Sequence, residues 1–216
     1  MAPLREKKKQ RRHERIMDVA LAAFNSKGIL NTTMLEIAEQ AELAVGTLYN
    51  YFPSKNALLI GIMEQKMRAS WEIDTKRIVK LYQSKNDPCA IVTKVVLEVV
   101  RKILVLTKQN WQEMLSALFS GPSRAELDQG IGLDLEAVAR LERMLRDLQR
   151  RGLVRGDAQS YAMAVQLYSI IAFQFLSYVF LPQMSEADLL DGIAQQIDLA
   201  FAGIGGGRGR PNEQPA

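Results

Sequence analysis

Residues 33–55, which read TMLEIAEQAELAVGTLYNYFPSK, constrain the fold of this chain more than any other stretch. Thr33 and Glu36 have the spacing of a capping box, in which each side chain bonds the backbone amide of the other residue. The apolar residues that follow fall on one face of a helix, at Met34, Ile37, Ala38 and Ala41. The stretch therefore predicts a short helix that starts at Thr33.

A second short helix is predicted over Val45–Phe52, after a turn over 42–44. Leu48 and Phe52 are spaced i, i+4 and form its inner face. Ser54 is a suitable N-cap for a further helix. Two helices joined by a turn of three or four residues form a helix-turn-helix unit, whose second helix enters the major groove of DNA.

The outer face of the second helix carries no charge and offers hydrogen-bonding groups. We predict contacts to base edges from Val45, Thr47 and Asn50. Contacts to phosphates are predicted from Thr33, Gly46, Tyr49, Tyr51 and Lys55. Helix-turn-helix patterns also arise by chance in α-rich proteins, so the flanking residues decide between recognition and simple packing.

The flanking residues on the amino-terminal side are strongly basic. Residues 1–15 hold seven Lys or Arg and two Glu, whereas the whole chain has a net charge of only +4. Such a segment can follow phosphates or enter a minor groove. The alternative is a solvated tail, and we expect a flexible arm over 1–10. A helix is predicted from Arg11, ending where Gly28 can supply a left-handed cap.

At this point the segment resembles the TetR family of bacterial transcriptional regulators. The resemblance is carried by AAFNSKG at 22–28, TTMLEIAEQA at 32–41 and VGTLYNYFPSKNALL at 45–59. It implies that DNA is bound by the eight residues named above for base and phosphate contacts. The family often has Gly and Ser in the turn, where this chain has Glu42 and Ala44. Because Ala44 cannot cap a helix, the second helix is expected to start without a side-chain cap.

Composition argues against an enzyme. His13 is the only histidine and Cys89 the only cysteine, so the chain offers neither a His/Cys zinc site nor a simple Cys–His pair. The glycine-rich GIGGGRG near the carboxyl terminus follows a helix and opens none, unlike a phosphate-binding loop. We predict no catalytic residues, no metal and no cofactor. Residues 205–216 are interpreted as a flexible tail.

The segment 158–185 contains no charged residue and is long enough to span a bilayer. Its glutamines and serines, and the lack of positive flanking charge, favour a soluble helix buried against its own domain and a partner. No signal peptide is recognised, and a single cysteine is typical of a reducing compartment. We therefore expect a cytoplasmic protein, with a membrane or lipid-binding helical protein as the less favoured alternative.

The remainder of the chain predicts helices only, giving an all-α fold of about nine helices. Helices are predicted over 57–82, 88–107, 110–119, 134–151, 158–181 and 186–204, with a loop or frayed turn at 128–132. The expected domains are a DNA-binding domain over 11–54 and an effector-binding and dimerisation domain over 55–204. Leu135, Val138, Leu141, Leu145 and Leu148 are expected to face inward.

The family resemblance implies a homodimer, formed by the last two helices of each subunit, and a small-molecule cavity in the second domain. The candidate lining residues are Met67, Trp71, Trp111, Met114, Phe119, Tyr168 and Phe175. Each of them can equally be core, but together they favour an apolar or aromatic effector. The leading hypothesis is a homodimeric repressor that binds a palindromic operator and is released by the effector. An activator of the same fold is the alternative.

Overall fold

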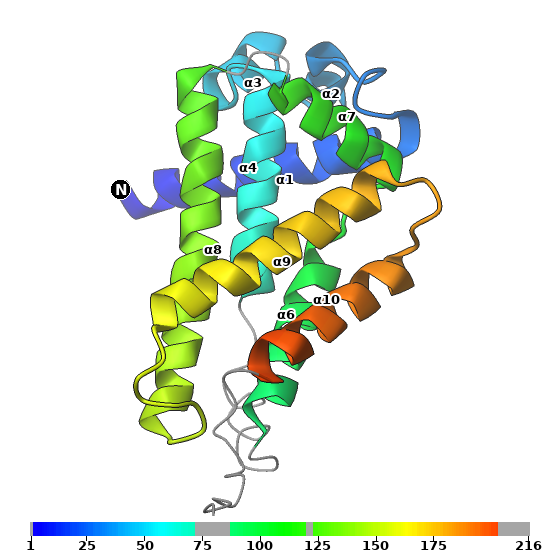
Figure 1. Ribbon diagram of the computed structural model, residues 1–216. Coiled ribbons are helices and arrows are strands. Elements are labelled where there is room, and N and C mark those ends of the chain that lie inside the picture. Colours follow the sequence, from blue (N-terminus) through cyan, green and yellow to red (C-terminus); the bar gives the residue numbers. More distant parts are fainter. Residues whose placement is uncertain (1, 72–86, 120–122, 203–216) are drawn as a thin grey trace, which may run out of the picture. The chain divides into compact units, whose positions relative to one another are not determined.

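The computed structural model describes residues 2–71, 87–119 and 123–202, with side chains described from Glu6 onward and left out for 117–119. Over these ranges the chain forms helices and no strand (Figure 1), which confirms the predicted all-α fold. The nine helices in the described ranges are α1 (Ala2–Lys27), α2 (Met34–Gln40), α3 (Val45–Tyr51), α4 (Lys55–Ser70), α6 (Pro88–Ile103), α7 (Lys108–Phe119), α8 (Arg124–Arg150), α9 (Ser160–Phe180) and α10 (Glu186–Ala202).

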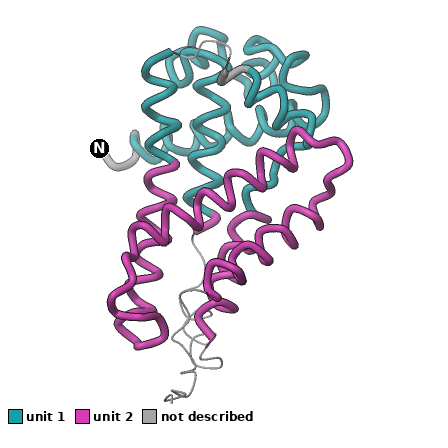
Figure 2. Tube along the Cα trace, viewed as in Figure 1, with its two compact units in different colours: residues 1–69, 102–133 teal, residues 70–101, 134–216 magenta. Residues whose placement is uncertain are grey.

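The chain divides into two compact units (Figure 2). Unit 1 comprises Met1–Ala69 and Lys102–Leu133, and unit 2 comprises Ser70–Arg101 and Asp134–Ala216. These limits differ from the domain limits expected from the sequence, because α4, α7 and the first part of α8 belong with the helix-turn-helix. The hydrogen bonds that α7 makes to the α1–α2 loop, given below, supply the physical reason.

Unit 1 is built around α1, α2 and α3, whose apolar faces meet. Ile16, Phe24, Ile37 and Leu48 are fully buried at 0% exposure. The face predicted for α2 is confirmed, since Met34, Ile37, Ala38 and Ala41 are all buried. Gly28 has a φ of 86°, so the predicted left-handed cap of α1 is confirmed as well.

Two helices begin earlier than the sequence predicts. α1 starts at Ala2 rather than Arg11, so the expected flexible arm is helical from Ala2 onward. α8 starts at Arg124, and the predicted loop at 128–132 is wrong. A capping box explains this second start, because the Glu126 amide donates to Ser123 Oγ at 3.3 Å and the Ser123 amide donates to Glu126 Oε2 at 2.8 Å.

In unit 2, α9 and α10 lie side by side (Figure 1). They approach closely at Gly192, where an added Cβ would lie 2.8 Å from the Gln174 side-chain oxygen. The predicted inner face of α8 is confirmed over 138–148, and Leu189, Ile193, Ile197 and Phe201 of α10 are buried as well. Leu135 is the exception, being 57% exposed.

α9 is long and apolar enough to cross a membrane, and only 22% of its most apolar window is buried in the single chain. Its buried residues include Met163, Ala164, Leu167 and Val179. Other apolar side chains of this helix are exposed, namely Tyr161, Val165, Phe173, Leu176 and Phe180. One such helix is weak support for a membrane span, and an uncovered apolar face also fits the partner contact expected from the sequence.

Candidate nucleic-acid interface

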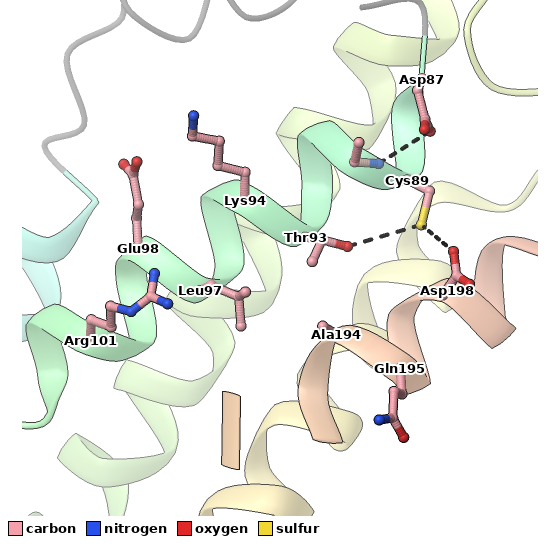
Figure 3. A pocket seen from close by; sticks show the side chains of 11 residues that line it. Asp87, Cys89, Thr93, Lys94, Leu97, Glu98, Arg101, Ala194, Gln195 and Asp198 are labelled. Atoms are coloured by element: carbon pink, nitrogen blue, oxygen red, sulfur yellow. Dashed lines mark hydrogen bonds between the residues drawn. The ribbon is translucent and has the colours of Figure 1, made fainter. Parts of the chain in front are cut away.

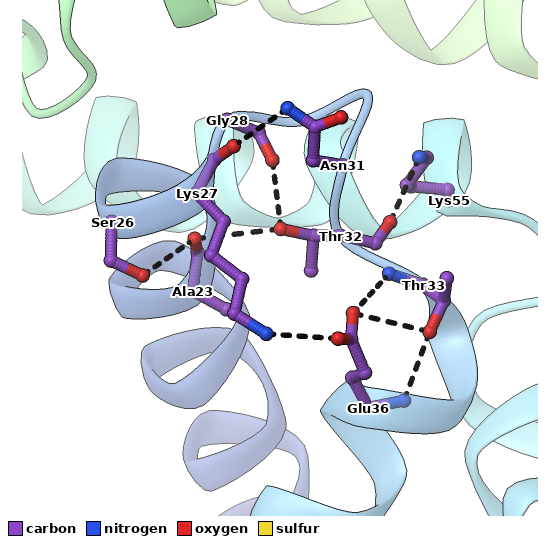
Figure 4. A network of polar contacts seen from close by, with 9 residues as sticks. All are labelled: Ala23, Ser26, Lys27, Gly28, Asn31, Thr32, Thr33, Glu36 and Lys55. Carbon is purple, nitrogen blue, oxygen red and sulfur yellow. Dashed lines mark hydrogen bonds and ion pairs between the residues drawn. The ribbon is translucent and has the colours of Figure 1, made fainter.

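The start of α2 is organised by the predicted capping box, which the structure confirms (Figure 4). The Thr33 amide donates to Glu36 Oε2 at 2.9 Å, and the Glu36 amide donates to Thr33 Oγ1 at 3.2 Å. Lys27 Nζ also donates to Glu36 Oε1 at 2.8 Å. The bonds from Lys27 and Thr33 lower the pKa of Glu36 to about 2. The Glu36 carboxylate therefore lies at the helix start where a phosphate was predicted to bind, leaving Thr33 itself exposed.

The turn between α2 and α3 is a Schellman motif centred on Glu42. The Leu43 amide donates to the Ala38 carbonyl at 2.8 Å, and the Glu42 amide donates to the Glu39 carbonyl at 3.0 Å. Glu42 has a φ of 58°, a left-handed conformation that glycine adopts without steric cost. Its carboxylate pairs with Arg15 of α1 at 2.8 Å. The turn thus keeps the conformation that favours glycine, although a glutamate occupies the position.

α3 is held from its inner side and uncovered on its outer side. Leu48 is 0% and Phe52 4% exposed, whereas Tyr49 is 48% exposed. Ala44 is the N-cap and makes no side-chain bond, as the sequence predicts. A Cβ added at Gly46 would meet nothing within 4 Å. Packing inside the described part of the chain therefore does not require glycine at position 46.

Phe52 is fixed between two other helices of unit 1. The His13 ring of α1 lies 4.7 Å from the Phe52 ring, centroid to centroid, and 6.2 Å from the Tyr51 ring. On α4, a Cβ added at Gly61 would come within 2.8 Å of Phe52 Cε1. Burial lowers the pKa of His13, which favours the neutral form of its ring. These contacts set where the last turn of α3 lies relative to α1 and α4.

Lys55 makes contacts within the chain that the sequence did not predict. Its Nζ donates to the Ile29 carbonyl at 2.7 Å. It also donates to the Thr32 carbonyl at 3.0 Å (Figure 4). Burial lowers its pKa. Because an ammonium has three N–H donors, one donor remains for a phosphate after the α1–α2 loop has used two. Lys55 is first of all a residue that fixes this loop.

A set of polar contacts from α7 to the end of α1 was not predicted from the sequence. Asn110, 2% exposed, donates to the Phe24 carbonyl at 2.7 Å and accepts from the Ile29 amide at 3.2 Å. Glu113 Oε2 accepts from the Leu30 amide at 2.9 Å. We name Asn110 and Glu113 the α7 clasp. No local pattern reveals it, since the partners are more than eighty residues apart.

The predicted ligand residues do not form one cluster within either unit. Met67, Trp111 and Met114 belong to unit 1, and Trp71, Tyr168 and Phe175 to unit 2. The Phe119 side chain lies outside the described residues. Trp111 and Met114 are buried, at 3% and 4% exposure. The Tyr168 hydroxyl donates to Asp134, and burial together with this bond raises the pKa of Tyr168.

A groove of about 590 Å³ lies between α6 and α10 of unit 2 (Figure 3), and none of its lining residues was predicted as a ligand contact. The Cys89 thiol donates to Asp198 at 3.4 Å there. Burial raises the pKa of Cys89 to about 11, so the thiol stays protonated near neutral pH and is a poor nucleophile. Lys94 and Arg101 also line this groove, together with apolar residues such as Leu97 and Ala194.

The part of the chain that matches a known family model is the helix-turn-helix region. Residues 16–62 match the family model described as bacterial regulatory proteins, tetR family. The HTH-type transcriptional repressor KstR of Mycolicibacterium smegmatis is 42% identical over 65 residues, which cover 30% of each chain. The HTH-type transcriptional regulator AcrR of Shigella flexneri is 24% identical over 193 residues, covering 85% of each chain.

Solved structures extend the likeness beyond the helix-turn-helix. The Thermus thermophilus FadR, a transcriptional repressor in complex with lauroyl-CoA, has a TM-score of 0.69 at 22% identity and covers 94% of this chain and 100% of its own. A transcription regulator from Haloarcula marismortui has a TM-score of 0.66 at 17% identity, covering 91% of this chain and 100% of its own. At such identities the likeness establishes the fold alone.

Proposed function

Because the chain belongs to the TetR family of bacterial regulatory proteins, we propose that it is a homodimeric repressor that binds a palindromic operator and is released by a small effector. The observation that carries this proposal is the geometry of α3. Its inner side is anchored by Leu48 and Phe52, while its outer side presents uncharged hydrogen-bonding groups to solvent. Such a surface suits base edges in a major groove.

On this proposal the residues of α3 divide by role. Thr47 and Asn50 bond base edges, and the Val45 methyl groups touch a thymine methyl. Tyr49 and Tyr51 donate to phosphates, and the backbone at Gly46 approaches a phosphate closely. Thr33 and the third donor of Lys55 add phosphate contacts from the loop beside α3. Specificity thus rests on three side chains and affinity on the others.

The exposed apolar face of α9 supports the dimer. Five large apolar side chains of one helix are uncovered in the single chain, with Phe173 70% exposed. An isolated monomer rarely exposes so many, and such a patch marks a protein interface. Pairing α9 and α10 with the same helices of a second copy gives a two-fold dimer. Its two copies of α3 then read half-sites about 34–36 Å apart, or a multiple of this.

The effector is proposed to be apolar. FadR, which shares the fold, binds lauroyl-CoA, whose acyl chain is hydrophobic. Met67, Trp71, Trp111, Met114, Phe119, Tyr168 and Phe175 remain the candidate contacts. The effector would favour one arrangement of the helical body and change the tilt of α4, moving the two copies of α3 out of register. By reciprocity, operator DNA weakens effector binding by the same factor.

The domain roles follow on the same proposal. Residues 11–54 bind DNA, supported by the α7 clasp, and residues 55–204 bind the effector and form the dimer. The segment 205–216, proposed as a flexible tail, lies outside the described residues. A DNA-binding regulator acts on chromosomal DNA, which places this protein in the cytoplasm.

The decisive experiment is selection of bound sequences from random duplex DNA, followed by titration of the selected duplex. We expect an enriched palindrome, and Thr47→Ala or Asn50→Ala should relax the base preference at one position of each half-site, by about 1–3 kcal/mol. Tyr49→Phe and Lys55→Ala should weaken binding to every duplex. Lys94→Ala on α6 is the control, because Lys94 is an exposed lysine that the proposal places neither on DNA nor in the dimer face. Failure to enrich any sequence would refute the proposal.

A further inference from the structure

The amino-terminal part of α1 carries a concentrated positive charge that takes no part in the proposed contacts of α3. We propose that its basic side chains bind the DNA backbone beside the groove that α3 enters, as a second, sequence-independent contact. This inference rests on the proposed function and deepens it. The side chains concerned are Lys7, Lys8, Lys9, Arg11 and Arg12, hereafter the basic stretch.

Every side chain of the basic stretch is exposed, and none of them forms an ion pair with another described residue. Five other cations of unit 1 behave differently. Arg15, Lys27, Arg68 and Arg124 each pair with a carboxylate, and Lys55 donates to two carbonyls. A folded chain that pairs its cations in one region and leaves five adjacent ones unpaired presents a local positive field, which attracts polyanions.

Helical geometry places most of this charge on one flank of α1. Lys8, Arg12 and Arg15 follow each other at i, i+4 and i+7, and Lys7 and Arg11 lie beside them. The flank is not the buried one, which contains Ile16, Ala20 and Phe24. Arg15 shows which way this charged flank faces, because the Arg15 side chain pairs with Glu42 in the turn that leads into α3. The charged flank therefore runs toward the start of the reading helix.

Length and composition favour DNA over other polyanionic surfaces. Residues 2–12 add roughly 16 Å of helix beyond His13, enough to reach phosphates outside the half-site. A membrane-surface helix needs an apolar face opposite its charges. The stretch 6–12 reads EKKKQRR and contains no apolar residue. Phosphates can be held by these side chains without any insertion into lipid.

The test compares two double variants of equal net charge. Lys8→Gln/Arg12→Gln removes two cations of the basic stretch, and Lys94→Gln/Arg101→Gln removes two exposed cations of unit 2. Affinity for the selected operator and for a random duplex is measured between 50 and 200 mM salt. If each side chain of a dimer covers one phosphate, the slope of log K against log salt becomes shallower by about 3.6. Over that range the unmodified protein then loses about 150-fold more affinity than the variant.

Both duplexes should weaken equally, and the ratio of their affinities should stay constant, because phosphates carry no sequence information. Circular dichroism checks that the variant keeps its helicity. Unchanged slopes, or an equal effect of Lys94→Gln/Arg101→Gln, would overturn the inference. Binding to phosphatidylglycerol vesicles that depends on the basic stretch, with unchanged DNA slopes, would overturn it in favour of a membrane.

The outcomes separate this inference from the proposed function. If Thr47→Ala removes base preference while the basic-stretch variant changes nothing, only the inference fails. If no sequence is enriched but random duplex still binds through the basic stretch, the proposed operator reading fails and the inference stands.

Discussion

The exposed faces of α3 and α9 differ in chemistry although the single chain leaves both uncovered. α3 shows Thr47, Asn50 and tyrosine hydroxyls, and it is only seven residues long. α9 shows aromatic and aliphatic side chains along twenty-one residues. A short face of hydrogen-bonding groups can match base edges. A long apolar face is instead stabilised when it is removed from water by a partner.

The two faces also differ in what holds them. α3 has no side-chain cap and is too short to be stable alone. It depends on Phe52 packed beside His13, on the turn at Glu42 and on the α7 clasp. α9 is much longer, and it packs against α10 on its buried side. We therefore expect substitutions elsewhere in unit 1 to disturb the proposed DNA-binding face of α3. The proposed dimer face of α9 should be disturbed mainly by substitutions of its own side chains.

The largest effect is expected on α9. Phe173→Glu places a carboxylate in the middle of the proposed dimer face, and loss of one interface hot spot weakens association by ~30-fold or more. Sedimentation velocity would then show a monomer at concentrations where the unmodified protein is a dimer. Leu35→Glu on α2, an apolar residue 54% exposed, is the control and should leave the dimer intact. A Phe173→Glu variant that still sediments as a dimer would remove α9 from the interface.

The α7 clasp gives the next largest effect. Asn110→Ala removes the acceptor of the Ile29 amide and one of two donors to the Phe24 carbonyl, which keeps its bond from the Gly28 amide. The buried amide without its acceptor should cost about 1–3 kcal/mol of unfolding free energy. Urea denaturation followed by circular dichroism measures this. Asn50→Ala is the matched control, since it removes an exposed asparagine from α3. We expect Asn50→Ala to change base preference and not stability, and Asn110→Ala to change stability. Equal stability of the two variants would show that the clasp contributes little.

These two regions also show what the sequence could predict. The capping box at Thr33, the apolar face of α2 and the glycine cap of α1 are local patterns, and all three are confirmed. Asn110 and Asn25 are joined to partners far along the chain, so no local period marks them. The unit limits could not be predicted for the same reason, because they depend on where α7 packs.

The error at 128–132 has a local cause. Residues 128–132 contain glycines at 130 and 132, which weaken a helix by about 1 kcal/mol each relative to alanine. The capping box of Ser123 and Glu126 and the long apolar face from Val138 onward compensate, so α8 continues through them. The contacts of Lys55 within the chain could not be predicted from its position in the family motif. Its bonds to the Ile29 and Thr32 carbonyls depend on a loop whose path no pattern gives.

Substitutions in the turn before α3 should have a smaller effect on the free energy of unfolding. They test how strongly this turn holds α3 in place. At Glu42 the left-handed φ of 58° costs a side chain about 1 kcal/mol relative to glycine. Glu42→Gly and Glu42→Ala both remove the ion pair with Arg15, so their comparison isolates the backbone. We expect Glu42→Gly to unfold at higher urea than Glu42→Ala, by about 1 kcal/mol in free energy. Equal midpoints would mean that the turn relaxes when the glutamate is removed.

The smallest effect concerns the start of α2 and depends on pH. The pKa of Glu36 falls from 4.5 to about 2 on folding, chiefly through the bond from Lys27. A lowered folded pKa gives stability that is fully present above pH 4.5 and is lost as pH falls toward 2. Glu36→Gln should therefore be less stable than the unmodified protein at pH 7, and the two should converge near pH 2.

The matched control for this pH dependence is Glu39→Gln, which removes a carboxylate exposed on the same helix. It should not show the convergence, because Glu39 takes no part in the capping box. Thermal unfolding from pH 7 to pH 2 distinguishes the two variants. A constant difference between Glu36→Gln and the unmodified protein across this range would mean that the capping geometry, and not the charge of Glu36, holds the start of α2. Any pH dependence of DNA binding by α3 would then have to come from other groups of unit 1. The apolar face of α9 carries no charged residue, so dimer formation through it should not depend on pH.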